Sequence, residues 1–211
     1  MRSLVLFLFL LSISQAAQAQ TKDNFFNEMN IILNHSFPPK DSTNGKTGFG
    51  VSLMGSFFKD RPFNITMGLC YINTSQYREY EPEDATKYHT NITYLIHSFS
   101  VPATFRMNFG KKFRFFIDAG AYLDINVSTL RKSVTYNPEL PVIQQQPELS
   151  KERINLSPLN YGPLAGLGIR IPVKTNDFLF RIEYKYGIQN IYKDHTPIYN
   201  RYLACILGFR F

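Results

Sequence analysis

The chain has 211 residues, of which 44% are hydrophobic and 15% aromatic, and its formal net charge is +7. The length allows one domain, and beyond the N-terminal segment no run of about 18 or more apolar residues predicts a membrane-spanning helix. Because the basic residues are scattered along the chain and form no patch, the charge indicates contact with anionic lipid head groups and not with nucleic acid.

The N-terminal segment has the three parts of a secretory signal peptide. Arg2 supplies a positive charge, an apolar run follows over residues 4–13, and Ala17-Gln18-Ala19 is a small-x-small cleavage site. The apolar run is shorter than the about 20 residues that a helix needs to span a bilayer. We therefore expect a cleaved signal peptide over residues 1–19 and an exported domain over residues 20–211. The alternative is that the segment forms a hydrophobic first strand.

The rest of the chain repeats one unit, which consists of an alternating strand, a tight turn, a second alternating strand and a longer polar loop. Strict alternation of apolar and polar residues predicts half-buried strands. It is cleanest over residues 178–189, where Phe180 and Ile182 alternate with Arg181 and Glu183. The pattern predicts eight strands, over residues 24–34, 48–58, 63–73, 94–107, 113–127, 159–173, 178–189 and 200–211.

Polar stretches separate these strands. Residues 37–46, 74–91 and 128–157 are predicted loops, and the last of them is the longest and is rich in proline, glutamine and charge. A loop of that length is usually functional or disordered. Within the strand predicted over residues 94–107, Pro102 cannot donate a ladder hydrogen bond and so predicts a β-bulge.

The final strand indicates the environment of the whole sheet. Leu203, Leu207 and Phe211 share an apolar face, whereas Gly208 and Arg210 lie on the other face. Strands of membrane barrels have this form, and their short turns and long loops alternate between the periplasmic and extracellular ends. We therefore predict an all-β fold, an eight-stranded antiparallel up-and-down transmembrane β-barrel in the cell outer membrane, with both termini in the periplasm. The alternative is a secreted sandwich or lipocalin-like barrel, in which the apolar face points inward.

Aromatic residues mark the two ends of the predicted strands. Near the short turns they are phenylalanines, namely Phe57, Phe58, Phe63, Phe105, Phe109, Phe113, Phe115, Phe178, Phe180, Phe209 and Phe211. Near the long loops they are tyrosines, namely Tyr71, Tyr94, Tyr186, Tyr192 and Tyr199. Two such rings are typical of the two membrane interfaces.

The face opposite the apolar one carries a set of charged residues. They are Glu28, Arg106, Arg114, Asp118, Asp124, Arg170, Arg181, Glu183, Lys185 and Arg210. An eight-stranded barrel is just wide enough for side chains to fill its interior, and buried charges must be paired. The pattern therefore predicts a salt-bridged network that fills the lumen, and a narrow ion path is the alternative.

The histidines and cysteines form no recognisable catalytic or metal site. Cys70 is expected to face inward and Cys205 outward, on strands that are not neighbours, so a disulfide would require backbone movement. The four histidines lie near the long-loop end, where some small outer-membrane barrels hold a lipid-modifying active site; they are His35, His89, His97 and His195. No spacing among them completes a triad or a metal site. We predict a non-enzymatic protein without a cofactor, with a lipid-modifying enzyme as an alternative.

Five short segments carry a family resemblance. They are S-V-P at 100–102, F-F-I-D-A-G-A-Y-L at 115–123, G-P-L-A-G-L-G-I at 162–169, E-Y-K-Y-G-I-Q-N-I at 183–191 and the closing L-G-F-R-F at 207–211. The exported chain resembles the small outer-membrane β-barrel domain family, which includes PorT-like proteins and OmpX- and OmpA-type eight-stranded barrels.

The resemblance implies insertion by the outer-membrane assembly machinery, which reads the last strand, and makes Leu207, Phe209 and Phe211 the candidate assembly signal. It leaves open whether the protein is a PorT-like component of a secretion system. Our main prediction is that its long loops, over residues 74–91 and 128–157, serve in binding or in envelope structure, with lipopolysaccharide among its partners and an extracellular partner of unknown identity.

Overall fold

The computed structural model describes residues 25–37, 43–58, 61–80, 89–110, 113–136, 148–154, 157–173, 176–190 and 199–211. The strands in this part of the chain are β1 (Phe26–Ser36), β2 (Thr43–Ser56), β3 (Phe63–Tyr80), β4 (His89–Phe109), β5 (Arg114–Tyr136), β6 (Glu148–Arg153), β7 (Leu159–Val173), β8 (Asn176–Asn190) and β9 (Tyr199–Arg210). The described residues contain no helix with the length and apolar character needed to cross a membrane. The predicted signal peptide, residues 1–19, lies outside them.

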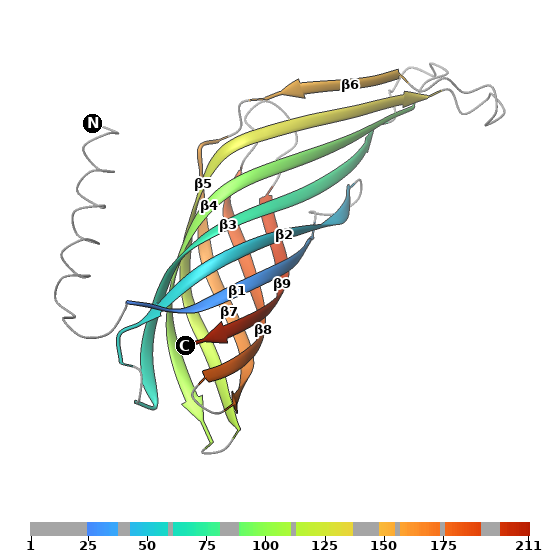
Figure 1. The fold of residues 1–211 in the computed structure, drawn as a ribbon. Helices are drawn as coiled ribbons and strands as arrows, with labels where there is room; N and C mark the ends of the chain where they lie inside the picture. Colours follow the sequence, from blue (N-terminus) through green and yellow to red (C-terminus); the bar gives the residue numbers. More distant parts are fainter. Residues whose placement is uncertain are drawn as a thin grey trace, which may run out of the picture.

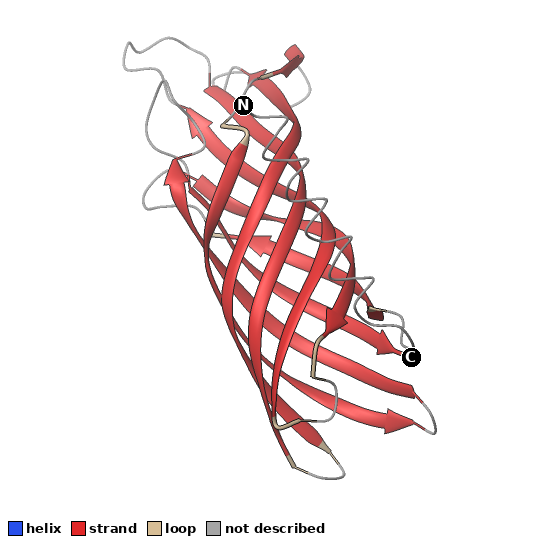
Figure 2. Ribbon diagram, turned by 90° about the vertical axis from the view of Figure 1, so that its left-hand side faces the viewer, coloured by secondary structure: helices blue, strands red, loops and turns tan. Residues whose placement is uncertain are grey.

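Eight of these strands close into one antiparallel barrel (Figures 1 and 2). In the wall, β1 to β5 follow one another as neighbours. β5 then pairs with β7, β7 with β8, and β8 with β9. The barrel closes where β9 pairs with β1, through neighbours such as Met29 with Phe209 and Leu33 with Cys205. Closure leaves the wall without an open edge, which backbone groups inside a bilayer require. The predicted eight-stranded up-and-down barrel is therefore confirmed.

Side chains alternate between the two faces of the wall. On β1, Leu33 is 55% exposed whereas its neighbour Ile32 is 3% exposed. The exposed face is apolar along the barrel part of every strand, and the buried face holds Arg106 and Asp118 among other polar residues. A soluble lipocalin-like barrel would have the opposite arrangement, with its apolar face inward. The arrangement seen here is the one that a lipid environment favours.

The phenylalanines near the short turns lie on the outer face, as predicted. Phe178 packs edge-on against Phe209 with ring centroids 5.4 Å apart, and Phe63 stacks on Phe105 at 5.7 Å. At the other end, Tyr186 lies on the outer face, where its ring and that of Tyr199 contact the Arg201 guanidinium at 3.9 and 4.9 Å.

Tyr94 and Tyr192 were also predicted at this interface. Tyr94 is an exception, because it shares the inward register of Ser98 and Ser100 and is buried. Tyr192 lies outside the described residues.

The predicted loops were too long, because β2 to β5 continue past the barrel (Figure 1). β2 already begins at Thr43, β3 runs on to Tyr80, and β4 begins at His89. β5 reaches Tyr136, and the ninth strand, β6, pairs with its far end from Leu130–Arg153 to Thr135–Glu148. We call the parts of β3, β4 and β5 beyond the barrel, together with β6, the strand extension.

Most of the strand extension was predicted as loop because its faces lack the regular alternation of the barrel wall. Ile92, Tyr94 and Ile96 point to the inner side, where they form a buried cluster against Ile154. The outer side mixes polar residues such as Thr93 with apolar ones such as Leu95. A search for the lipid-facing pattern therefore finds no regular strand here.

The register shifts at four places in the described strands, two of them between Lys46 and Gly50 and between Tyr186 and Asn190, and none lies at Pro102. Asn27 is bulged where β1 meets β2, which accounts for the break in the apolar alternation of that strand. Val127 is bulged on β5, since His97 pairs with Ser128 and Ser98 with Asn126. The predicted bulge at Pro102 was wrong. β3 and β4 keep one register across it, from Met67–Ala103 to Cys70–Ser100, and the missing N–H interrupts the ladder without shifting it.

A charge placed on the outer face should test whether lipid covers it. Leu33→Arg, midway along the outer face of β1, is expected to lower the free energy of unfolding by about 2–4 kcal/mol in lipid vesicles. The matched control is Leu149→Arg on β6, which is also well exposed but lies beyond the barrel, and it should change stability by less than about 1 kcal/mol. Denaturant titration of the refolded proteins measures both values, and equal effects would contradict the lipid assignment.

Candidate functional site

The structure gathers most of the predicted lumen charges on the inner face of the barrel. Eight of the ten side chains are buried, namely Glu28, Arg106, Asp118, Asp124, Arg170, Arg181, Glu183 and Lys185. Arg114 is exposed and Arg210 is half-buried. Both keep the inward register, but they lie at the first residue of β5 and the last residue of β9, where the strands end at the rim. Arg114 is therefore not a lumen residue, contrary to the prediction.

A cluster of five charged residues crosses the lumen near the short turns. Arg106 on β4 donates to both oxygens of Asp118 on β5, from Nε at 2.8 Å and from Nη2 at 2.9 Å. Its Nη1 reaches Glu28 Oε2 on β1 at 3.3 Å. Arg181 on β8 donates to the same Asp118 Oδ2 at 3.2 Å and has its Nε 3.6 Å from Glu183 Oε2. The two hydrogen bonds between Arg106 and Asp118 give this ion pair both strength and a fixed geometry.

Aromatic packing supports the centre of this cluster. The guanidinium of Arg106 lies 4.2 Å from the centroid of the Phe116 ring, which is itself buried. The ring fits because Gly168 on the neighbouring strand has no side chain, and a Cβ there would come within 2.4 Å of Phe116 Cζ. The cluster therefore depends on a small residue as well as on its charges.

Arg170 is buried on the same inner face but is poorly paired. Its Nε lies 3.7 Å from Asp177 Oδ2, which is too long for a good hydrogen bond. None of its three guanidinium nitrogens has a hydrogen-bond partner among the described residues. Of the predicted charges, Arg170 is thus the one with the least compensation for its burial.

A second polar group lies further along the lumen, toward the long loops. Lys185 donates to Ser100 Oγ at 3.0 Å, and its ammonium lies 4.8 Å from the Tyr122 ring centroid and 5.5 Å from that of Tyr202. Asp124 accepts a hydrogen bond from Asn160 at 3.2 Å. The lysine is therefore held mainly by a hydroxyl and two aromatic faces.

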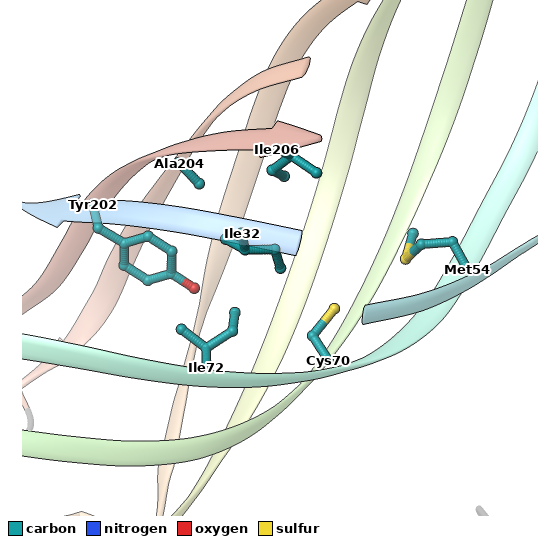
Figure 3. Close-up of a cluster of buried hydrophobic side chains, with 7 residues drawn as sticks. All are labelled: Ile32, Met54, Cys70, Ile72, Tyr202, Ala204 and Ile206. Carbon is teal, nitrogen blue, oxygen red and sulfur yellow. The ribbon is translucent and has the colours of Figure 1, made fainter. Parts of the chain in front are cut away.

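An apolar layer lies beside this group. It consists of Ile32, Met54, Cys70, Ile72, Tyr202, Ala204 and Ile206, from β1, β2, β3 and β9. Figure 3 shows these side chains pointing toward one another inside the barrel. Cys70 is buried here while Cys205 is exposed on the outer face, which confirms the predicted directions of the two thiols.

Several of these contacts join strands that are not neighbours in the wall. Arg106–Glu28 joins β4 to β1, and Arg181–Asp118 joins β8 to β5. Lys185–Ser100 joins β8 to β4. Nearer the long loops, Gln76 Nε2 on β3 donates to the Tyr199 carbonyl on β9 at 3.3 Å. Contacts therefore cross the interior at three heights along the barrel.

The neutral partners in the lumen were not among the predicted site residues. Tyr122, Tyr202, Asn160 and Ser100 carry no charge, so a search for inward charges passed over them. A usable signal was present nevertheless, because Tyr122 shares the inward register of Asp118 and Asp124 on β5.

The histidines are not assembled into a catalytic group in the described part of the chain. His97 Nδ1 lies 2.7 Å from the Tyr71 hydroxyl and 3.2 Å from Asn73 Nδ2, on the outer face of β3 and β4. His35 Nδ1 lies 3.5 Å from Thr47 Oγ1. The side chains of His89 and His195 fall outside the described residues. Where side chains are described, no three histidine, cysteine or acidic groups could hold a metal ion.

The predicted assembly signal lies on the outer face of β9. Leu207 and Phe211 are exposed, and Phe209 packs against Phe178. All three side chains therefore point away from the lumen at or near the short-turn end.

Comparisons with known proteins give a family match and several similar solved structures. A family model described as "Outer membrane protein beta-barrel domain" matches residues 16–193. Neisserial surface protein A shares 14% identity with this chain, with a TM-score of 0.44, covering 87% of this chain and 94% of its own.

Two further solved structures give lower scores. The attachment invasion locus protein Ail of Yersinia pestis, in complex with the heparin analogue sucrose octasulfate, shares 14% identity, covers 88% and 97% of the two chains, and has a TM-score of 0.38. The N-terminal β-barrel domain of Pseudomonas aeruginosa OprF shares 11% identity, covers 88% and 98%, and also has a TM-score of 0.38. The comparison with curated protein sequences gives no significant match.

Removing the shared carboxylate of the charged cluster should destabilise the barrel. Asp118→Asn keeps the shape of the side chain but leaves Arg106 and Arg181 without the charge that both contact. We expect a loss of about 3–5 kcal/mol in the free energy of unfolding, because a buried charge then loses its partner. Denaturant unfolding in detergent or lipid measures the loss, and an unchanged value would show that the cluster is not a stabilising pair.

Replacing the poorly paired arginine should have the opposite result. Arg170→Met removes a buried guanidinium without a good partner and keeps an apolar stem of similar length. Stability is expected to stay within about 1 kcal/mol of the original or to rise. The matched variant is Arg106→Met, which removes a fully engaged guanidinium from the same face and should be strongly destabilising. Similar losses for both variants would contradict the assignment.

Proposed function

Because the chain belongs to the outer membrane protein β-barrel domain family, we propose that it is an integral outer-membrane protein with a filled lumen, which acts through its outward-reaching strands and not by transport or catalysis. In this proposal the chain is exported by its N-terminal signal peptide, and the final strand, with Leu207, Phe209 and Phe211, is read by the assembly machinery. Both termini then lie in the periplasm, and the strand extension lies outside the cell.

The dimensions of the apolar face support insertion into a bilayer. On the outer face of β4, exposed aromatic side chains run from Phe109 near a short turn to Phe99. Ten residues of strand rise about 33 Å, which is about 25 Å along the axis of a barrel whose strands tilt by about 40°. The apolar band of outer-membrane barrels has this height, about 25 Å.

The observation that carries the filled lumen is the set of contacts between strands that are not neighbours. Arg106 to Glu28, Lys185 to Ser100 and Gln76 to Tyr199 span the interior at successive heights. The apolar layer around Tyr202 fills the interior beside these contacts, since Ala204 pairs with Glu183 and Tyr202 with Lys185 on the neighbouring strand. A hydrated ion would have to displace both paired charges and packed apolar side chains, so the interior favours stability over conduction.

The contacts of the described histidines also favour a protein that catalyses no reaction. The partners of His97 are a phenol and an amide, and that of His35 is a hydroxyl. Neither imidazole contacts a carboxylate that could orient it as a general base toward a nucleophile. The strand extension is then the part of the molecule that is free to meet a partner, since the remainder lies in lipid.

Planar-bilayer recording tests the filled lumen. We expect the inserted protein to give no resolvable conductance steps, because side chains occupy the interior at three heights. As a comparison, the double variant Lys185→Ala/Tyr202→Ala empties the middle of the lumen and should raise the ion leak. Insertion is verified on the same samples by heat-modifiable gel migration. Discrete steps from the unaltered protein would rule out the filled lumen and favour the narrow porin.

A further inference from the structure

Basic residues gather on one face of the strand extension. The pairing of neighbouring strands aligns four residues in one row across the extension. They are Tyr77 on β3, Thr93 on β4, Lys132 on β5 and Lys151 on β6. Lys46 on β2 reaches the same row, since its Nζ lies 3.0 Å from Thr93 Oγ1 and 4.9 Å from the Tyr77 ring centroid. We call Lys46, Lys132 and Lys151 the outer basic row.

The row belongs to the face that continues the lipid-facing wall. On β4, Thr93 keeps the outward register of Phe99, Val101 and Phe105. On β5 the bulge at Val127 shifts the outward register by one residue, so that Ser128 pairs with His97 and Lys132 with Thr93. Without that bulge Lys132 would point to the inner side. The outer basic row is thus continuous with the membrane surface of the barrel.

The two faces of β6 carry charges of opposite sign. Leu149, Lys151 and Arg153 share the face of Lys132, whereas Glu148 and Glu152 lie on the other. Glu152 pairs across that inner face with Arg131, at 4.0 Å. Arg153 adds a further positive charge one step closer to the barrel than the row. On β5 and β6, the described side chains of the outer face include basic groups and no acidic ones.

The height of the row indicates which anionic groups could reach it. Thr93 lies six residues beyond Phe99 on β4. That distance is about 20 Å along the strand and about 15 Å along the membrane normal for a strand tilted by about 40°. The phospholipid head-group layer is only about 5–8 Å thick on each side of a bilayer. The row therefore lies above ordinary phospholipid phosphates, at the level of a longer head group.

We infer that the outer basic row binds the phosphorylated sugar head group of an outer-leaflet glycolipid. The acyl chains of such a lipid would lie against the apolar wall, and its phosphates would meet the three ammonium groups. Lysine contacts phosphate as a point charge, and several lysines at a membrane surface add their attractions. The inference rests on the proposed function, which places the long-loop end of the barrel outside the cell.

Binding to a phosphorylated glycolipid and to its dephosphorylated form tests the inference. The refolded full-length protein is titrated in detergent with fluorescent lipopolysaccharide whose core sugars carry phosphates beyond the acylated anchor, and with the same lipid after removal of those phosphates. We expect the phosphorylated form to bind more tightly, with an affinity that falls as salt is raised. The triple variant Lys46→Gln/Lys132→Gln/Lys151→Gln should bind it on the order of 100-fold more weakly.

Two neighbouring residues on β5 provide a matched control. Lys132→Gln and Arg131→Gln each remove one positive charge from adjacent positions, but they lie on opposite faces of the extension. Lys132→Gln is expected to weaken binding about fivefold, and Arg131→Gln should leave it unchanged. Equal losses for the two variants would show that only net charge matters and would overturn the inference.

The remaining outcomes separate this inference from the proposed function. Equal binding of the two lipid forms by a protein that migrates as a folded, heat-modifiable barrel overturns the basic row alone. A protein that never shows heat-modifiable migration overturns the membrane barrel itself. If the triple variant does not fold, Lys151→Gln on the exposed strand β6 replaces it, and unchanged binding by that variant also counts against the row.

Discussion

The bidentate pair between Arg106 and Asp118 is the contact on which the interior of the barrel is built. It joins two neighbouring strands, and the same two side chains reach Glu28 and Arg181 on strands farther around the wall. Five charges inside a narrow barrel are tolerable only when each has a partner, because desolvation of an unpaired ion costs several kcal/mol. The pairing fixes which residues must face inward at the short-turn end. It thereby also fixes the register of the strands that carry them.

Two environments act on the same strands. Inside the membrane the outer face must be apolar, and closure through β1 and β9 satisfies the backbone. Beyond the membrane the outer face meets water and the inner face becomes the sheltered one, which explains why Ile92 and Ile96 point inward there. The change of environment lies near His97 on β4 and Val127 on β5. Polar contacts of His97 with Tyr71 and Asn73 lie at this boundary.

The sequence pattern was sufficient for the barrel but not for its contacts or its extension. Alternation with period two identified all eight barrel strands, because one-sided burial in lipid leaves a regular pattern. The extension was predicted as loop, since residues such as Thr90 and Ser133 carry no lipid-facing pattern although their backbones are fully paired. Their positions in the alternation identified both Arg170 and Arg106 as inward-facing residues. It could not show that Arg106 is fully paired whereas Arg170 is not, because partners across the lumen depend on how far apart non-neighbouring strands lie.

The bulge at Val127 also has a consequence for how the family can diversify. Below it, β5 is held between β4 and β7 over Arg114 to Ile125, so a one-residue insertion there would turn lipid-facing side chains into the lumen. Above it, β5 pairs with the extended part of β4 and with β6, a short strand exposed throughout, and a gain or loss of one residue would exchange the faces of β5 there without moving the wall. The bulge therefore separates a part of the gene in which length is fixed from a part in which length can drift, and new surface specificities can arise in the second part without refolding the first.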